Sequence, residues 1–234
     1  KMKPIQSLFS GLNYLFFPRI CCTCAEPLSK NETHFCLNCL IDLPYTHFEK
    51  QENNPAIQRM WGRFPFQYGT SVFHFSKQSI IQNLLHQIKY GGNPDLVEFM
   101  GEKMGLRLEN TPFTTFPDLI VPVPIHPLKE QKRGYNQSDL LCKGISKVSH
   151  IEYRTDLLVR KSLSESQTKK NRSDRWENVA TEFELNKKIK ISNKHILLVD
   201  DVMTTGATIE ACAIALQQIP GITISFATLA IAEI

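Results

Sequence analysis

The feature that most constrains the fold of this chain is an unbroken apolar strand that runs into two carboxylates and a threonine–glycine turn. From residue 196 the sequence is Ile-Leu-Leu-Val-Asp-Asp-Val-Met-Thr-Thr-Gly-Ala-Thr, and it continues into a helical apolar pattern over residues 209–219. A strand without a polar break predicts burial on both faces, as in a parallel sheet covered by helices. Ligands of such open sheets bind beyond the carboxyl ends of the strands, so this turn is expected to face a ligand.

The residues of this turn carry the chemistry of a ribose-phosphate site. Free N–H groups at the start of a helix attract phosphate, and glycine lets the backbone approach a ligand closely because it has no Cβ. We therefore expect a 5′-phosphate to bind Thr204, Thr205, Gly206, Ala207 and Thr208. Asp200 and Asp201 supply carboxylates for the ribose hydroxyls or a hydrated Mg2+ ion, and they are the candidate catalytic residues. Capping of an ordinary helix by threonine hydroxyls is the alternative, and it leaves the paired carboxylates unexplained.

Strand and helix patterns alternate along the rest of the chain, which favours an α/β fold with a parallel sheet flanked by helices. Helical spacing of apolar residues is found over residues 80–90, 96–104 and 140–148. Short apolar runs predict strands at residues 119–121, 157–160 and 222–231. Residues 66–75 have the pattern of a strand or hairpin, and the polar residues 45–62 have that of a linker. The expected division is a linker and hairpin over residues 46–75 and an α/β domain over residues 76–234.

Four cysteines in residues 1–45 have the spacing of a small zinc module. Cys21 and Cys24 form one C-x2-C pair, and Cys36 and Cys39 form a second pair after an eleven-residue gap. Two such pairs can place four thiolates tetrahedrally around one Zn2+ ion. Because four cysteines leave no position open for water, the expected role of the ion is structural. Disulfide pairing is the competing interpretation, and it would need an oxidising compartment.

Composition excludes several other classes of protein. Hydrophobic residues make up 42% of the chain and charged residues 21%, which are ordinary globular values and argue against disorder along the whole chain. The longest apolar-leaning stretch is an amphipathic helical pattern over residues 5–17. It is too short to span a membrane, and it lacks a signal-peptide cleavage site. We therefore expect a soluble cytoplasmic protein without a membrane span.

The mild net charge of +4 conceals a basic segment. Residues 154–194 hold 11 Lys or Arg and 6 Asp or Glu, a surplus of +5, so the rest of the chain is close to neutral. Such a segment suits a phosphate-rich ligand or a nucleic acid, although a solvated loop would have the same composition. Its centre, residues 161–178, is nearly free of apolar residues, and long loops in compact domains are usually functional or disordered. The candidate ligand-binding cations in it are Lys169, Lys170, Arg172 and Arg175.

A second candidate ligand segment follows the strand predicted at residues 119–121. Because that strand is buried, the following residues should open at the same edge of the sheet. Arg133 offers a bidentate fork for phosphate oxygens, and Asn136 and Gln137 offer amide donors. Asn136 is also placed to cap the helix that follows, which does not exclude a ligand role. Lys89 is a further ligand candidate at the end of a predicted helix, where the helix dipole favours a cation.

Together these motifs resemble the ComF family of type I phosphoribosyltransferase-like proteins. The matching blocks keep their order along the chain: the four cysteines, Ile88–Gly92, Pro122–Pro127 with Arg133–Gln137, a spaced set from Arg160 to Phe183, and Asp200–Thr208. The resemblance implies a type I phosphoribosyltransferase fold that binds phosphoribosyl pyrophosphate with Mg2+. It also places a pyrophosphate loop in the block before Gln137, and a flexible loop that closes over the active site in residues 161–178.

The resemblance implies a reaction in which a nitrogen acceptor displaces pyrophosphate from C1′ of the ribose. Positioning and charge stabilisation would supply the rate, with no covalent residue required. The family also implies a role in competence, the uptake of transforming DNA. An alternative function is therefore a factor that handles single-stranded DNA and whose phosphoribosyl site is regulatory. A regulatory protein that senses the ligand without turnover is a third hypothesis.

Overall fold

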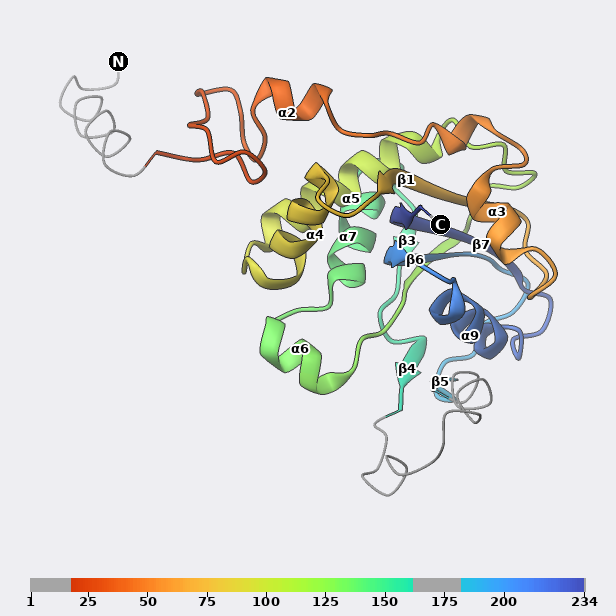
Figure 1. The fold of residues 1–234 in the computed structure, drawn as a ribbon. Helices are drawn as coiled ribbons and strands as arrows, with labels where there is room; N and C mark the ends of the chain where they lie inside the picture. Colours follow the sequence, from red (N-terminus) through yellow and green to blue (C-terminus); the bar gives the residue numbers. More distant parts are fainter. Residues whose placement is uncertain (1–17, 162–181, 234) are drawn as a thin grey trace, which may run out of the picture.

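The computed structural model describes residues 18–161 and 182–233, and a parallel sheet lies at its centre (Figure 1). Five strands stand in the order β1-β7-β6-β2-β3, and each neighbouring pair is parallel. Their bounds are Gly69–Phe75 for β1, Leu119–Pro122 for β2, Glu152–Tyr153 for β3, His195–Met203 for β6 and Thr223–Ala232 for β7. A separate antiparallel pair consists of β4 (Leu158–Arg160) and β5 (Phe183–Leu185). The predicted α/β class is confirmed.

Helices cover both faces of the sheet (Figure 1). One face carries α4 (Ile80–Tyr90), α5 (Pro94–Leu108) and α7 (Gln137–Ser149), and the other carries α3 (Pro55–Met60) and α9 (Ala207–Leu216). The connections contain α2 (Leu37–Ile41), η1 (Phe48–Lys50) and α6 (Pro127–Arg133). In β6, Leu197 and Val199 pack into the first layer, whereas Ile196 and Leu198 pack into the second. The unbroken apolar run therefore serves two hydrophobic cores at once, as predicted for a strand buried on both faces.

Of the two alternatives predicted for residues 66–75, strand or hairpin, the strand is confirmed as β1. Residues 69–75 form one strand that pairs in parallel with β7, from Gly69 opposite Phe226 to Phe75 opposite Ala232. The hairpin alternative for this segment is therefore wrong, because a hairpin pairs antiparallel with its neighbour in sequence. A boundary before residue 76 would separate β1 from the sheet to which it belongs. The exact division into domains stays a prediction.

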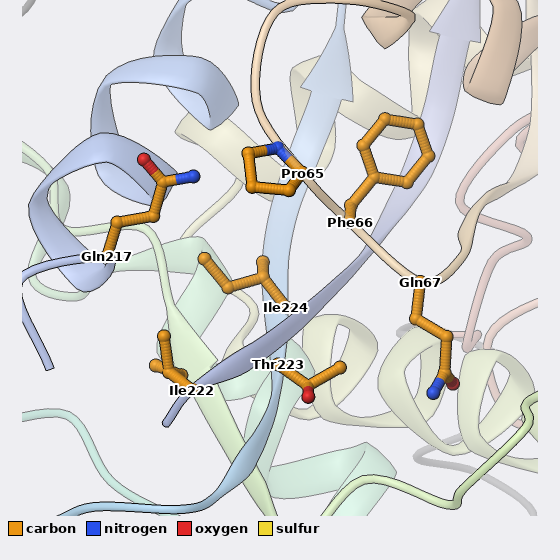
Figure 2. A pocket seen from close by; sticks show the side chains of 7 residues that line it. All are labelled: Pro65, Phe66, Gln67, Gln217, Ile222, Thr223 and Ile224. Carbon is orange, nitrogen blue, oxygen red and sulfur yellow. The ribbon is translucent and has the colours of Figure 1, made fainter. Parts of the chain in front are cut away.

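A pocket of about 290 Å3 opens at the amino end of β7, away from the turn after β6 (Figure 2). Its lining consists of Pro65, Phe66, Gln67, Gln217, Ile222, Thr223 and Ile224. No charged side chain is among these residues, so the pocket offers neither cations for a phosphate nor carboxylates for a metal. The carboxylates and the threonine–glycine turn that the sequence predicts as a ligand site lie at the opposite, carboxyl ends of the strands.

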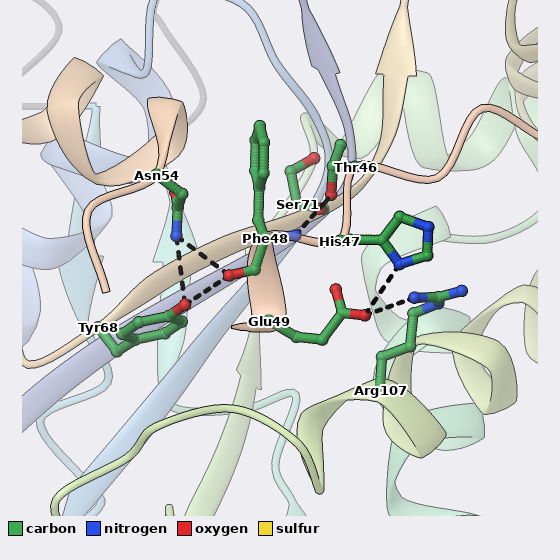
Figure 3. Close-up of polar contacts among 8 residues, drawn as sticks. All are labelled: Thr46, His47, Phe48, Glu49, Asn54, Tyr68, Ser71 and Arg107. Atoms are coloured by element: carbon green, nitrogen blue, oxygen red, sulfur yellow. Dashed lines mark hydrogen bonds and ion pairs between the residues drawn. The ribbon is translucent and has the colours of Figure 1, made fainter. Parts of the chain in front are cut away.

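The polar segment before β1, predicted as a linker, is packed structure that contains η1 and α3. Asn54 is fully buried, and its Oδ1 caps α3 by accepting the N–H groups of Ala56 (2.9 Å) and Ile57 (3.1 Å). Its Nδ2 donates to the carbonyl of Gly69 at 2.9 Å, which ties the segment to β1. Tyr68 Oη donates to the carbonyl of Phe48 at 2.6 Å (Figure 3). The linker prediction for residues 45–62 is therefore wrong at Asn54, which takes part in a buried polar network with β1.

The same segment buries a carboxylate against α5. Glu49 is 4% exposed, and its Oε1 lies 2.6 Å from Nη1 of Arg107 and 3.7 Å from Nδ1 of His47 (Figure 3). The Arg107 guanidinium also lies 3.7 Å from the ring centre of Tyr45, a cation–π contact. Arg107 therefore neutralises a charge that the fold has removed from water.

Replacing Arg107 by methionine is expected to lower the free energy of unfolding by about 2–4 kcal/mol, because Glu49 would remain buried without its charge partner. Arg107→Met/Glu49→Gln should recover much of that loss, since the double variant has no buried charge. Urea denaturation of the two variants and the wild type measures both changes. A loss below about 0.5 kcal/mol in Arg107→Met would mean that the pair behaves like an exposed one.

Candidate functional site

The site candidates gather where the connections of the sheet change face. Strands β2 and β6 are neighbours, but β2 continues through α6 and α7 to β3, whereas β6 continues through α9 on the opposite face to β7. Such a point leaves a crevice beyond the carboxyl ends of the two strands, where ligands of open α/β sheets bind. The connection after β2 contacts β6 there: Oγ of Ser138 in α7 donates to Oδ1 of Asp200 in β6 at 3.2 Å.

Asp200 and Asp201 lie in the last part of β6, which runs on to Met203. Asp200 is 9% exposed, and its Oδ1 accepts the N–H of Asp201 at 2.9 Å. Burial, and then the charge of Asp201, raise the pKa of Asp200 to about 7. Oδ2 of Asp201 lies 3.2 Å from Nζ of Lys89 in the last turn of α4. Two adjacent carboxylates at the crevice are an oxygen donor set that fits Mg2+.

The turn after β6 presents backbone donors at the start of α9. Gly206 caps the helix with a φ of 81°, a conformation that side chains disfavour. The N–H of Ala207 donates to Oγ1 of Thr205 at 3.4 Å, and the first N–H of the helix to bond a backbone carbonyl is that of Glu210, to Gly206 at 3.0 Å. Within the described residues, the N–H groups of Thr208 and Ile209 have no hydrogen-bond partner. Together with the exposed side chains of Thr204, Thr205 and Thr208, this arrangement suits a phosphate.

Arg133 lies at the end of α6, on the segment that follows β2. Its Nη1 donates to Oε1 of Gln137 at 2.7 Å, and its guanidinium lies 5.5 Å from the ring centre of Tyr90 in the last turn of α4. Gln137 is 1% exposed, and its Nε2 has no partner among the described residues. The Arg133 side chain thus lies beside the last turn of α4, in which Lys89, the residue before Tyr90, pairs with Asp201.

Asn136 holds the start of α7. Its Oδ1 accepts the N–H of Ser138 at 3.1 Å, which is the predicted helix cap. Its Nδ2 donates to the carbonyl of Val123 at 3.1 Å and to Oδ1 of Asp139 at 2.7 Å. Both amide hydrogens of Asn136 are therefore used within the protein. Its contribution to the site is to join the segment after β2 to α7.

Asp139, in the first turn of α7, makes the stability of the fold depend on pH. Burial, and then the charge of Glu130, raise the pKa of Asp139 to about 7, although a hydrogen bond from Asn136 opposes the shift. Because the folded pKa exceeds the ordinary value of about 3.9, this acid stabilises the fold below about pH 4 and loses that contribution as the pH rises to 7.

We therefore expect Asp139→Asn to raise the free energy of unfolding at pH 8 by about 1–3 kcal/mol relative to wild type, with the difference vanishing near pH 4. Urea denaturation at the two pH values measures it. Equal stabilities at pH 8 would show that Asp139 is charged in the fold without penalty.

The candidate cations Lys169, Lys170, Arg172 and Arg175 lie outside the described residues. The described flanks of the basic segment are largely ion-paired: Arg154 with Asp156 (2.9 Å), Arg160 with Glu182, Lys161 with Glu184 (3.4 Å) and Lys194 with Asp118 (3.9 Å). Within the described residues, Lys187, Lys188 and Lys190 have no ion-pair partner. The free positive charge of these flanks is therefore smaller than composition suggests.

The four cysteines of the N-terminal module converge at one point. The sulfur atoms of Cys21, Cys24, Cys36 and Cys39 all lie within 4.8 Å of one another, and those of Cys24 and Cys36 are 3.7 Å apart. Four sulfurs bound to one tetrahedral Zn2+ ion would stand about 3.8 Å apart, so the cluster could hold this ion. All seven cysteines of the chain are free thiols.

The module is fixed to the α/β body through α5. His34 and Phe35 contact the ring of Phe99, with ring centres 5.2 Å and 6.2 Å apart. Cys21 and Cys39 belong to the same hydrophobic cluster as α4, α5 and α7. The cysteine cluster is therefore part of one core rather than a free appendage.

Sequence reasoning missed two arginines that reach the turn after β6 from the other side. Nη1 of Arg59 in α3 donates to the carbonyl of Thr204 at 2.8 Å, and Nη1 of Arg63 donates to that of Thr205 at 2.6 Å. Both lie in or beside the segment predicted as a linker. No local pattern distinguishes an arginine that contacts a distant turn from one that faces solvent.

No family model matches the chain, but relatives align with 44% to 86% of it. It is 27% identical over 197 residues to the DNA utilization protein YhgH of Escherichia coli K12, covering 83% of this chain and 82% of the relative. It is 25% identical over 204 residues to competence protein ComFC of Bacillus subtilis, covering 86% and 78%. A 104-residue match to competence protein F of Haemophilus influenzae has 32% identity and covers 44% and 45%. These relatives confirm the resemblance inferred from the motifs.

Solved structures give weaker similarities. An adenine phosphoribosyltransferase from Leishmania tarentolae has a TM-score of 0.37 and 12% identity, over 76% of this chain and 88% of that one. The glutamine phosphoribosylpyrophosphate amidotransferase from B. subtilis has a TM-score of 0.41 and 14% identity, over 60% of this chain and 30% of the enzyme. Among the helices that the structure describes, none combines the length and apolar character needed to cross a membrane.

Proposed function

We propose that this chain, a relative of the ComF competence proteins, binds phosphoribosyl pyrophosphate with Mg2+ at the crevice between β2 and β6. The observation that carries the proposal is the position of two adjacent carboxylates, Asp200 and Asp201, immediately before a glycine-capped helix start with unbonded N–H groups. A ribose 5-phosphate needs both features, because its hydroxyls and its phosphate lie at opposite ends of the sugar.

Each part of the ligand has proposed partners. The 5′-phosphate binds the turn from Thr204 to Thr208, and the ribose hydroxyls face the two carboxylates, which also hold Mg2+. The pyrophosphate lies toward Lys89 and Arg133, whose positive side chains stand on the neighbouring elements α4 and α6. With Mg2+ bound, Asp201 would no longer need Lys89 as its charge partner, and Lys89 would be free to contact the pyrophosphate.

In the transfer reaction, a nitrogen acceptor forms a bond to C1′ as the bond from C1′ to the pyrophosphate oxygen breaks. The electron pair of that bond leaves with the pyrophosphate. The protein contributes position and positive charge near the leaving group, and Mg2+ supplies further charge neutralisation when bound. Lys169, Arg172 and Arg175 are proposed to add cations over the same group.

Calorimetric titration of phosphoribosyl pyrophosphate with Mg2+ tests the proposal. The wild type should bind in the micromolar range, and Asp201→Asn should bind at least about tenfold more weakly. Glu152→Gln, which alters an exposed carboxylate in β3 of the same sheet, is the control and should bind like the wild type. Absence of binding in the wild type, or unchanged affinity in Asp201→Asn, would reject the assignment. Release of pyrophosphate on adding nucleobases or amines then separates an enzyme from a ligand sensor.

Handling of single-stranded DNA is the second candidate function, favoured by the relatives named for DNA utilization and competence. In the described residues, its proposed contacts are the unpaired Lys187, Lys188 and Lys190. A fluorescent single-stranded oligonucleotide should then bind with an affinity that falls steeply as salt rises. Replacing these three lysines by glutamine should reduce that salt dependence. An affinity for the oligonucleotide that does not change with salt concentration would exclude the handling of single-stranded DNA.

A further inference from the structure

Two arginines, one in α3 and one just after it, donate hydrogen bonds to carbonyls of the turn after β6. Nη1 of Arg59 donates to the carbonyls of Thr204 (2.8 Å) and Met203 (3.4 Å), and its Nη2 donates to that of Ala232 (2.8 Å) at the end of β7. Nη1 of Arg63 donates to the carbonyl of Thr205 at 2.6 Å. The two guanidinium groups thus donate hydrogen bonds to the carbonyls of three successive residues, from the last residue of β6 into the turn.

This arrangement decides which way the peptide groups of the turn face. A peptide carbonyl and the N–H of the same peptide point in opposite directions, because the unit is planar and trans. Carbonyls fixed toward α3 therefore turn the N–H groups of residues 204–206 away from α3. Met60 completes the support, since a Cβ on Gly206 would lie 2.3 Å from its sulfur.

Arg63 also forms an ion pair with Glu210 in α9. Glu210 lies in the first turn of α9, where its carboxylate would repel a bound phosphate. Nη1 of Arg63 lies 3.5 Å from Oε2 of Glu210, and both side chains are about one quarter exposed. The arginine therefore offsets the one acidic side chain in the first turn of this helix.

We infer that Arg59 and Arg63 are positioning residues of the phosphate-binding turn, and that Arg63 also neutralises Glu210 beside it. The inference rests on the proposed function only for the identity of the anion. It makes the segment before β1 part of the site, although neither arginine is placed in contact with the ligand.

The test uses ribose 5-phosphate as a probe of the turn and inorganic pyrophosphate as a probe of the other half of the site, both by calorimetry. Arg63→Gln should weaken ribose 5-phosphate binding by about tenfold or more and leave pyrophosphate binding unchanged. Glu210→Gln should bind ribose 5-phosphate as well as the wild type or better. Arg63→Gln/Glu210→Gln should recover part of the loss, and Arg63→Lys should recover part through its retained charge.

Other outcomes overturn the inference in distinct ways. Full recovery in the double variant would mean that Arg63 acts by charge alone and does not position the turn. Equal losses for both probes would indicate a general loss of structure. Wild-type affinity in both Arg63→Gln and Arg59→Met would remove both residues from the site.

Failure of the proposed function is separately visible, because the wild type would then bind neither probe. In that case the backbone amide order parameters of residues 204–207 still test the support of the turn. They should fall from about 0.85 toward 0.6 in Arg59→Met and Arg63→Gln. Unchanged order parameters would contradict the inference whatever the ligand.

Discussion

Replacing Gly206 by alanine is expected to weaken the binding of phosphoribosyl pyrophosphate by about a hundredfold or more, which corresponds to about 2.7 kcal/mol. Two effects combine at this position. The backbone has a φ of 81°, and the added Cβ would lie 2.3 Å from the sulfur of Met60 and 3.1 Å from Nη1 of Arg63. Met60 is fully buried, so its sulfur cannot move aside without disturbing the core. The turn must therefore shift, and its N–H groups lose their common direction.

Gly221→Ala is the matched control for this prediction. Gly221 has a φ of 68°, and a Cβ there would lie 2.0 Å from Oδ1 of Asn193, at the amino end of β7. Both variants should lower the free energy of unfolding by about 1–3 kcal/mol, but only Gly206→Ala should lose affinity for the ligand. Calorimetry for affinity and urea denaturation for stability separate the two effects. Equal affinities in the two variants would show that the turn does not bind the phosphate.

Loss of the metal from the N-terminal module is expected to have the largest effect on stability. Structural Zn2+ contributes about 10–16 kcal/mol of binding free energy in small zinc-dependent folds, and that energy is available only to the folded module. Cys36→Ser should therefore abolish zinc binding and unfold the module. The sulfur of Cys36 also accepts the N–H of Cys39 at the start of α2, so this helix should be lost with it.

Cys22→Ser is the control, because Cys22 lies in the same loop but outside the four-sulfur cluster. Elemental analysis should find about one Zn2+ per chain in the wild type and in Cys22→Ser, and none in Cys36→Ser. Chelation of the wild type should reproduce the loss of helical circular dichroism seen in Cys36→Ser. A metal-free wild type with full thermal stability would refute a structural zinc site.

The parts of the fold that could be predicted are those that depend on the residue pattern of a single segment. The run from Ile196 to Val199 alternates between two cores and was predicted as a buried strand from its composition alone. Helices α4, α5, α7 and α9 follow from apolar spacing and from caps such as Asn136. The turn at Gly206 was recognisable because glycine and carboxylates have few other reasons to follow a buried strand.

What could not be predicted depends on contacts between distant segments. Asn54 belongs to a polar stretch typical of a linker, yet it is fully buried because its amide bonds the backbone of β1. The parallel pairing of β1 with β7 leaves no signal in either strand. The same holds for Arg59, whose partners are the carbonyls of residues 204 and 232. Such pairings are properties of the assembled sheet, so single-segment patterns do not contain them.

The pairing of β1 with β7 also sets the order in which this protein can fold. Tyr68 and Ser225, which are hydrogen-bonded at this edge, are 157 residues apart along the chain. During synthesis, β1 therefore emerges from the ribosome long before its partner and must wait unpaired, as contacts of high sequence separation form late. The four cysteines lie within residues 21–39, so their cluster can close before β7 is made, whereas its packing against α5 must wait for that helix. The turn after β6, which Arg59 joins to Ala232 in β7, becomes complete only when this edge of the sheet has paired.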